Sequence, residues 1–116
     1  MAVDSLRLVI EMRGCAYDRL NDREALLQLL HKAAKAADVH VLGEMSHQFD
    51  PQGVTAILLL SESHLSIHTW PEKGYASADF FTCGSNSKPW LALAIFKEVL
   101  QPRQTEVREL KHSIEA

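Results

Sequence analysis

Three segments with the pattern of β-strands follow one another between residues 54 and 83, and only short turns separate them. Residues 54–61 are almost all apolar, as expected for a strand that is covered on both faces. Residues 64–70 and 75–83 alternate with the period of two of a half-buried strand, and a turn is expected at residues 84–87, where the last of these strands ends. Strands joined by such short turns pair antiparallel, because a parallel neighbour needs a crossover of about a dozen residues. The sequence therefore predicts an antiparallel sheet.

A strand and a helix precede these segments. Residues 6–12 alternate in the manner of a strand, which Gly14 ends. The spacing of apolar residues predicts a helix over residues 22–37. Asn21 is followed three residues later by Glu24, which is the pattern of a helix N-cap with a reciprocal partner. We therefore expect Asn21 to cap this helix.

The remaining segments complete the order strand, helix, four strands, helix, strand. Residues 39–49 predict a strand with an irregular apolar pattern, and residues 50–53 hold the proline and glycine of a tight turn. Pro89 suits the first turn of a helix over residues 90–100. Residues 105–114 are rich in charge and are expected to form an edge strand.

This order predicts an α+β fold, a two-layer sandwich in which a mainly antiparallel sheet carries the helices on one face, built as a single domain over residues 1–116. A two-layer sandwich leaves the other face of the sheet uncovered. Residues 57–60 are apolar on both faces of their strand. We therefore expect a second copy of the chain to cover the open face, sheet to sheet, as a dimer.

Composition narrows the classes of function. With 116 residues, 47% of them hydrophobic, the chain can build one core, and its two cysteines, Cys15 and Cys83, are too few for a disulfide framework. This favours a cytoplasmic protein. No apolar run approaches the roughly 20 residues of a membrane span, and the first residues lack a signal-peptide pattern. The net charge of −3, with scattered Lys and Arg, argues against nucleic-acid or membrane partners and favours a small molecule or a protein.

The segment from Leu60 to Trp70 concentrates polar side chains where a buried hairpin is predicted. Its period of two places His64, Ser66, His68 and Trp70 on one face of the strand. A buried hydroxyl or imidazole without a partner costs on the order of 1–3 kcal/mol, so this many polar groups together indicate a functional site.

The peptide between Glu62 and Ser63 can support backbone chemistry. A serine hydroxyl can attack the carbonyl of the residue before it and convert the amide into an ester, if the peptide is strained and a neighbour stabilises the oxyanion. Elimination then breaks the ester, and hydrolysis of the resulting dehydroalanine leaves an N-terminal pyruvoyl group. That ketone can form a Schiff base with a substrate amine and act as an electron sink in a decarboxylation.

The run LSESHLSIHTWPEKGYASADFFTCG, with FDPQGVT upstream, resembles the short prokaryotic form of S-adenosylmethionine decarboxylase. The resemblance covers nearly the whole chain and is poor only in the C-terminal tail. It implies a proenzyme that cleaves itself between Glu62 and Ser63 into a β chain, residues 1–62, and an α chain, residues 63–116, which begins with a pyruvoyl group from Ser63. It also implies conversion of S-adenosylmethionine to its decarboxylated form and CO₂, without metal or pyridoxal phosphate, to supply aminopropyl groups for spermidine synthesis.

The resemblance assigns roles in processing and catalysis. His68 matches the base of the elimination step, and Cys83 matches the residue that returns a proton to the substrate carbon after CO₂ leaves. Thr55 stands where the family usually has a serine that hydrogen-bonds the processing intermediate. Threonine keeps the hydroxyl, so we expect processing to survive.

The resemblance also assigns the substrate pocket. Phe49 matches the aromatic residue that stacks on the adenine, Glu72 matches the carboxylate that binds the ribose hydroxyls, and Trp70 is expected to line the same pocket. A pyruvoyl-dependent decarboxylase of ornithine or arginine is the alternative, although a basic amino acid has no ribose to engage Glu72.

Other interpretations of the same residues remain open. Taken alone, Ser63 is most often an ordinary turn residue. His64, His68 and Cys83 could bind zinc, although no fourth ligand is evident. An unprocessed homologue that acts as a regulatory subunit is a further alternative, against which the intact Glu62-Ser63 peptide speaks.

Overall fold

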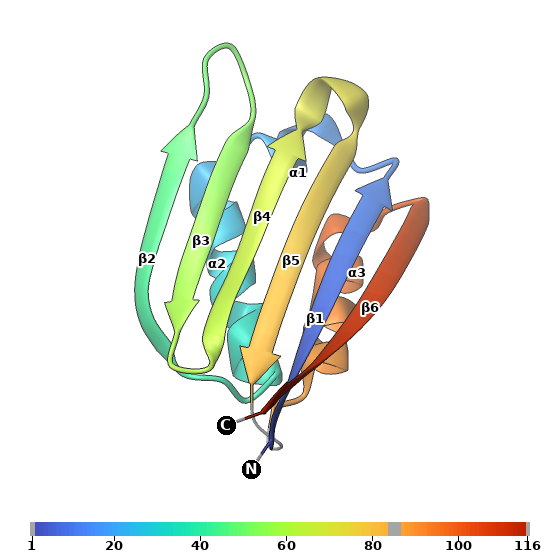
Figure 1. Cartoon of the computed structure of the whole chain (residues 1–116). Helices are drawn as coiled ribbons and strands as arrows, with labels where there is room; N and C mark the ends of the chain where they lie inside the picture. The colour runs from blue at the N-terminus through green and yellow to red at the C-terminus, as the bar shows by residue number, and fades with distance from the viewer. Residues whose placement is uncertain (1, 84–86, 116) are drawn as a thin grey trace.

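The computed structural model describes residues 2–83 and 87–115; residues 84–86, in the turn predicted at 84–87, lie outside the described residues. Within the described part, six strands form one antiparallel sheet in the order β2-β3-β4-β5-β1-β6 (Figure 1). The elements are β1 (Ala2–Arg13), α1 (Tyr17–Leu20), α2 (Arg23–Ala36), β2 (Val41–Gln48), β3 (Val54–Leu60), β4 (Ser63–Trp70), the short 3₁₀ helix η1 (Pro71–Lys73), β5 (Tyr75–Cys83), α3 (Pro89–Leu100) and β6 (Gln104–Glu115).

Helices α2 and α3 pack side by side on one face of the sheet, behind it in Figure 1. The predicted α+β fold, a two-layer sandwich with helices on one face, is therefore confirmed. None of the helices within residues 2–83 and 87–115 has the length and apolar character that crossing a bilayer requires.

The core lies between the sheet and these two helices. Alternate residues of each central strand point into it, and each large apolar side chain that leaves water there stabilises the fold by about 1.5–3 kcal/mol. The fully buried side chains include Leu8, Ile10, Leu58, Leu65, Ile67 and Phe80 from the sheet and Leu30 and Phe96 from the helices. This alternation fixes which residues point the other way.

The opposite face of the sheet carries no helix among the described elements. In β4, Leu65, Ile67 and Thr69 are buried in the core, so the intervening residues point to this open face, as the sequence predicts. Strand β3 alternates too: Ile57 and Leu59 remain 38% and 57% exposed on the open face. The expectation that β3 is covered on both faces is thus not met within one chain.

The structure corrects the start of helix α2. The helix begins at Arg23, and its N-cap is Asp22, whose Oδ1 accepts a 3.0 Å hydrogen bond from the Ala25 N–H. The prediction of Asn21 as the cap, with Glu24 as its partner, was wrong. Asn21 Oδ1 instead accepts hydrogen bonds from Gln48 Nε2, at the end of β2, and from the Gly53 N–H in the loop that follows, so it is engaged outside the helix.

The C-terminal segment forms β6, an edge strand that pairs antiparallel with β1 along its whole length. The predicted edge strand at residues 105–114 is confirmed, and it is longer than expected. Strand β2 is shorter than predicted, and its register shifts between Val41 and Gly43.

Candidate active site

The peptide between Glu62 and Ser63 lies in the tight turn from β3 to β4. Ser63 has a φ of 151°, and a non-glycine residue held at positive φ costs about 1–3 kcal/mol. Its Oγ lies 3.3 Å from His64 Nδ1. The Cys83 N–H donates a 3.1 Å hydrogen bond to the carbonyl oxygen of Glu62. The turn therefore holds both a strained serine and a donor on the carbonyl before it.

The side chain of Glu62 is held as firmly as its carbonyl. Its carboxylate accepts hydrogen bonds from the His40 N–H at 3.0 Å, from His40 Nδ1 at 2.9 Å and from the Ser61 hydroxyl at 3.0 Å. Burial raises the pKa of Glu62, but the hydrogen bonds from His40 and Ser61 outweigh it and lower the pKa to about 2. Glu62 is therefore a carboxylate at any physiological pH.

A pocket of about 310 Å³ opens on the open face at the other end of β3 and β4. Its lining brings together the predicted residues Phe49, Thr55, His68, Trp70 and Glu72, and adds Gln52, Gly53 and Thr69. Thr55 and His68 are direct cross-strand neighbours, with Thr55 Oγ1 2.7 Å from His68 Nδ1. The pocket thus combines aromatic rings, a carboxylate and an imidazole whose orientation is fixed by a hydroxyl.

The loop that carries Phe49 is held by hydrogen bonds within itself and to neighbouring elements. Phe49 N–H donates to the Gly53 carbonyl at 2.8 Å, which closes the loop on itself. Asn21 Oδ1 then accepts from the Gly53 N–H at 3.0 Å and from Gln48 Nε2 at 2.9 Å. Beneath the loop, the buried Thr69 hydroxyl accepts from the Val54 N–H at 2.9 Å. These contacts set the position of the aromatic ring.

Comparisons of this chain with protein families, with other sequences and with solved structures all indicate the same family. A family model described as S-adenosylmethionine decarboxylase matches residues 6–113. Two proteins named S-adenosylmethionine decarboxylase proenzyme are 42% identical over 107 residues: one of Methanococcus maripaludis, covering 92% of this chain and 88% of the relative, and one of Pelotomaculum thermopropionicum, covering 92% and 85%. The crystal structure of the adenosylmethionine decarboxylase from Aquifex aeolicus matches with a TM-score of 0.90 at 32% identity, covering 98% of this chain and 94% of that one. The chain therefore belongs to the S-adenosylmethionine decarboxylase family.

Membership in this family confirms the resemblance seen in the sequence and makes the chain an enzyme, a decarboxylase. Its predicted site residues fall into two groups, one at the β3–β4 turn and one in the pocket. Glu62, Ser63 and Cys83 meet at the β3–β4 turn, where the Cys83 N–H binds the Glu62 carbonyl. His68 lies five residues further along β4 than Ser63, which is about 16 Å at the usual rise of a strand. The resemblance gives His68 the role of base in the elimination at Ser63, but this separation keeps His68 away from Ser63 of the same chain.

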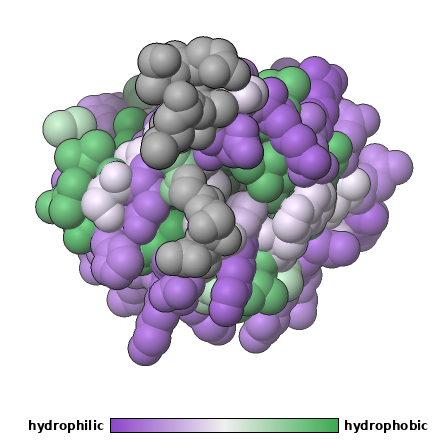
Figure 2. Space-filling model, turned by 60° about the horizontal axis from the view of Figure 1, so that its bottom comes forward, coloured by the Kyte–Doolittle hydropathy of each residue, from purple (hydrophilic) through white to green (hydrophobic). Residues whose placement is uncertain are grey.

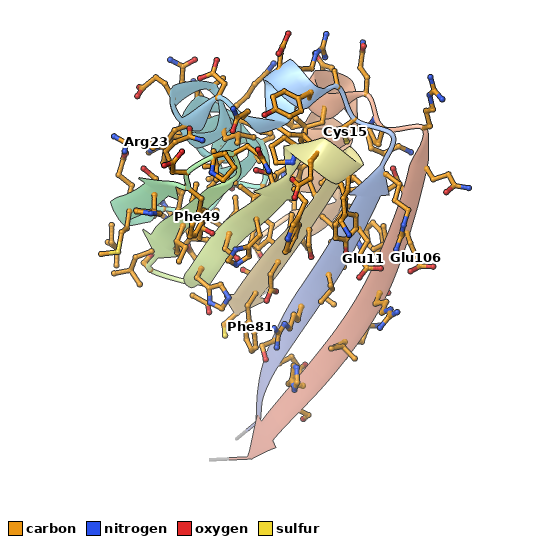
Figure 3. All side chains as sticks on the ribbon, turned by 90° about the horizontal axis from the view of Figure 1, so that it is seen from above. Glu11, Cys15, Arg23, Phe49, Phe81 and Glu106 are labelled. Atoms are coloured by element: carbon orange, nitrogen blue, oxygen red, sulfur yellow. The ribbon has the colours of Figure 1, made fainter. Side chains whose placement is uncertain are left out.

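Sequence reasoning missed two contacts on the open face, an ion pair and a pair of stacked rings. Arg7 binds Asp79 through two hydrogen bonds of 3.0 and 2.6 Å, and this contact raises the pKa of Arg7. Phe81, on the same face (Figure 3), stacks on His112 with ring centroids 5.4 Å apart. Arg7 and Asp79 are 72 positions apart, so no sequence pattern links them.

Two buried hydroxyls near the turn have no hydrogen-bond partner among the described residues. Ser5 is the cross-strand neighbour of Cys83, and Thr82 is the neighbour of Ser63. An unpaired buried hydroxyl costs about 1–3 kcal/mol, so such groups are rare in native structures. In the described part of the chain, no three His, Cys, Asp or Glu side chains gather as a metal site would require.

Proposed function

We propose that this chain cleaves itself between Glu62 and Ser63, and that the resulting enzyme uses the pyruvoyl group formed from Ser63 to decarboxylate S-adenosylmethionine. The product would supply aminopropyl groups for spermidine synthesis. The observation that carries the proposal is the Cys83 N–H on the Glu62 carbonyl, next to a serine at positive φ, in a member of this family.

The geometry of the turn supports the first step of cleavage. Ser63 Oγ attacks the Glu62 carbonyl carbon, the C–N bond breaks, and an ester replaces the amide. Negative charge develops on the carbonyl oxygen during this attack, and the Cys83 N–H already points at that oxygen from 3.1 Å. Removal of the Ser63 Cα proton then breaks the Cβ–O bond, which releases Glu62 as a free carboxylate and leaves dehydroalanine at position 63. The imine tautomer of dehydroalanine adds water and loses ammonia, which leaves the ketone.

The residues present fit a pyruvoyl group at position 63. Ser63 supplies the carbon skeleton of the pyruvoyl group. Cys83 lies next to position 63, because its N–H binds the carbonyl of the preceding residue, Glu62. The ketone would supply an electron sink for the electron pair that stays on the substrate when CO₂ leaves. We assign Cys83 the return of a proton to the substrate carbon after CO₂ has left.

The pocket supports a nucleoside substrate. Phe49 and Trp70 are half exposed, so their ring faces are available to a purine. Glu72 lines the same pocket and can accept hydrogen bonds from two vicinal hydroxyls. Ornithine or arginine would leave both features unused, so the pocket favours S-adenosylmethionine.

We further propose that two chains pack sheet to sheet and share their sites. The turn with Ser63 and Cys83 lies at one end of the sheet, and the pocket with His68 lies at the other. A two-fold axis that crosses the strands and lies between the sheets would place the pocket of one chain opposite the turn of its partner. The exposed apolar side chains of Met45, Ile57 and Leu59 on the open face support such packing.

The intact mass of the purified protein tests the cleavage. We expect one fragment with the mass of residues 1–62 and a second that is lighter than residues 63–116 by one ammonia, because it has no amino-terminal amine. Ser63→Ala should remain one inactive chain. A wild-type chain that stays at full length during prolonged incubation would contradict the proposal. Turnover assays of the cleaved protein with S-adenosylmethionine, ornithine and arginine identify the substrate.

A further inference from the structure

We propose that His40 is a positioning residue for self-cleavage, which holds the Glu62 side chain so that the carbonyl attacked by Ser63 stays on the Cys83 N–H. The inference rests on the proposed function, because it concerns the rate of the proposed cleavage. His40 lies between α2 and β2, and it meets the scissile turn only in the folded chain.

The contact between the two segments is reciprocal. His40 donates its backbone N–H and its Nδ1–H to the Glu62 carboxylate, at 3.0 and 2.9 Å. In return, the His40 carbonyl accepts the Ser61 N–H at 2.9 Å. The α2–β2 connection is therefore tied both to Glu62, which precedes the scissile bond, and to Ser61 before it. Figure 2 brings forward this end of the molecule, where hydrophilic and hydrophobic residues are intermixed.

Two anchors on one residue restrict its orientation. The Glu62 carboxylate is held by His40 and Ser61, and its carbonyl oxygen is held by the Cys83 N–H. An attacking oxygen must lie within about 3–3.5 Å of the carbonyl carbon and approach it from above the plane of the peptide, so small rotations of the peptide change the rate strongly. The strained φ of Ser63 also persists only if its surroundings hold it.

The protonation states agree with this arrangement. A carboxylate can only accept hydrogen bonds, so Nδ1 of His40 must carry a proton in either charge state of the ring. The hydrogen bond to Glu62 and the charge of that carboxylate raise the pKa of His40. The imidazole is nevertheless 77% exposed, and an ion pair this exposed contributes little to folding. Its effect should therefore appear in the cleavage rate and not in the unfolding temperature.

The test compares the cleavage rates of four purified proenzymes, followed by intact mass from the start of incubation. His40→Ala removes the Nδ1 contact and keeps the backbone one; we expect cleavage to slow about two- to fivefold, as for loss of an exposed charged contact. His40→Asn puts an amide nitrogen near the position of Nδ1 and should restore most of the rate. His31→Ala is the matched control, because His31 Nε2 makes a similar 2.9 Å contact with Glu44 away from the turn. It should cleave like wild type.

Thermal unfolding of Ser63→Ala backgrounds, which cannot cleave, should show equal midpoints for all variants. Wild-type rates in both His40 variants would overturn the inference while leaving the proposed function intact. An Asn variant as slow as the Ala variant would also overturn it, since the hydrogen bond would then not be responsible. Failure of the wild-type chain to cleave would instead contradict the proposed function itself.

Discussion

Thr55 shows how a single substitution can be judged from the contact it makes. The resemblance seen in the sequence implies a serine at this position, and the threonine hydroxyl lies 2.7 Å from His68 Nδ1. The additional methyl group restricts the rotamers of the side chain, which holds the hydroxyl toward the ring. With Nδ1 engaged in this way, Nε2 is the nitrogen left to act as a base. The change from serine therefore preserves the contact on which the proposed role of His68 depends.

We predict that Thr55→Val slows self-cleavage by roughly tenfold, a small part of the 10²–10⁴ that a positioned base contributes. Valine has nearly the same shape as threonine but no hydroxyl, so the imidazole loses its orienting partner. Thr55→Ser is the matched control and should cleave at nearly the wild-type rate. Time courses of intact mass measure both rates. Equal cleavage by the valine variant would show that the hydroxyl does not orient His68.

At the level of elements, strand periodicity correctly predicts those strands whose alternate residues are buried in the core. The sequence places a strand at residues 75–83, and the structure has β5 at Tyr75–Cys83, because the alternation there reflects burial against the helices. The prediction of Asn21 as the N-cap of α2 was wrong because Asn21 and Asp22 are both residue types that favour the N-cap position. The choice depends on Gly53, which is 32 positions away and meets Asn21 only in the folded chain.

In the candidate site, too, some features could be predicted from the sequence and others could not. The resemblance selects three pocket residues, and the structure places Thr55 and His68, which the resemblance assigned to processing, in the same pocket. The distance between Ser63 and His68 follows from their separation along one strand, so the sequence contained that information. His40 could not be found this way, because it lies 22 positions from Glu62 and no periodicity relates the two.

The Asn21 contact gives a prediction about the loop between β2 and β3. Asn21→Ala removes the acceptor for the Gly53 N–H and Gln48 Nε2, so the loop that carries Phe49 loses its anchor. We expect the KM for S-adenosylmethionine to rise about fivefold, which corresponds to about 1 kcal/mol for the two lost hydrogen bonds together, with kcat per cleaved chain unchanged. Asn21→Asp keeps the acceptor and should keep the wild-type KM. Steady-state kinetics decide, and an unchanged KM in the alanine variant would contradict the assignment.

At the level of the whole molecule, one chain presents two half-sites and an apolar open face. Ile57 and Leu59 are exposed on that face although they lie in a strand next to the centre of the sheet. Apolar side chains gathered on a face without a covering layer are typical of a protein interface. If the face pairs with a second copy, each complete site consists of Ser63 and Cys83 from one chain and the pocket from its partner.

This arrangement predicts complementation between two inactive variants. Cys83→Ala damages the turn half of the site, and Glu72→Ala damages the pocket half, so each alone should lose most activity. In a mixed dimer, the intact turn of the Glu72→Ala chain faces the intact pocket of the Cys83→Ala chain. Random pairing makes half of the dimers mixed, each with one intact site of two, so co-expression should restore about a quarter of the wild-type activity.

A site contained within one chain gives the opposite result, because every site in the mixed dimers then keeps one defect. Co-expression of the two variants would in that case stay as inactive as either alone. A second pairing separates the cases further. Wild type co-expressed with the Cys83→Ala, Glu72→Ala double variant should have about a quarter of full activity if sites are shared, and about half if each chain holds its own. Native mass spectrometry of the same samples confirms that mixed dimers have formed, so the activity ratio reports which chain completes which site.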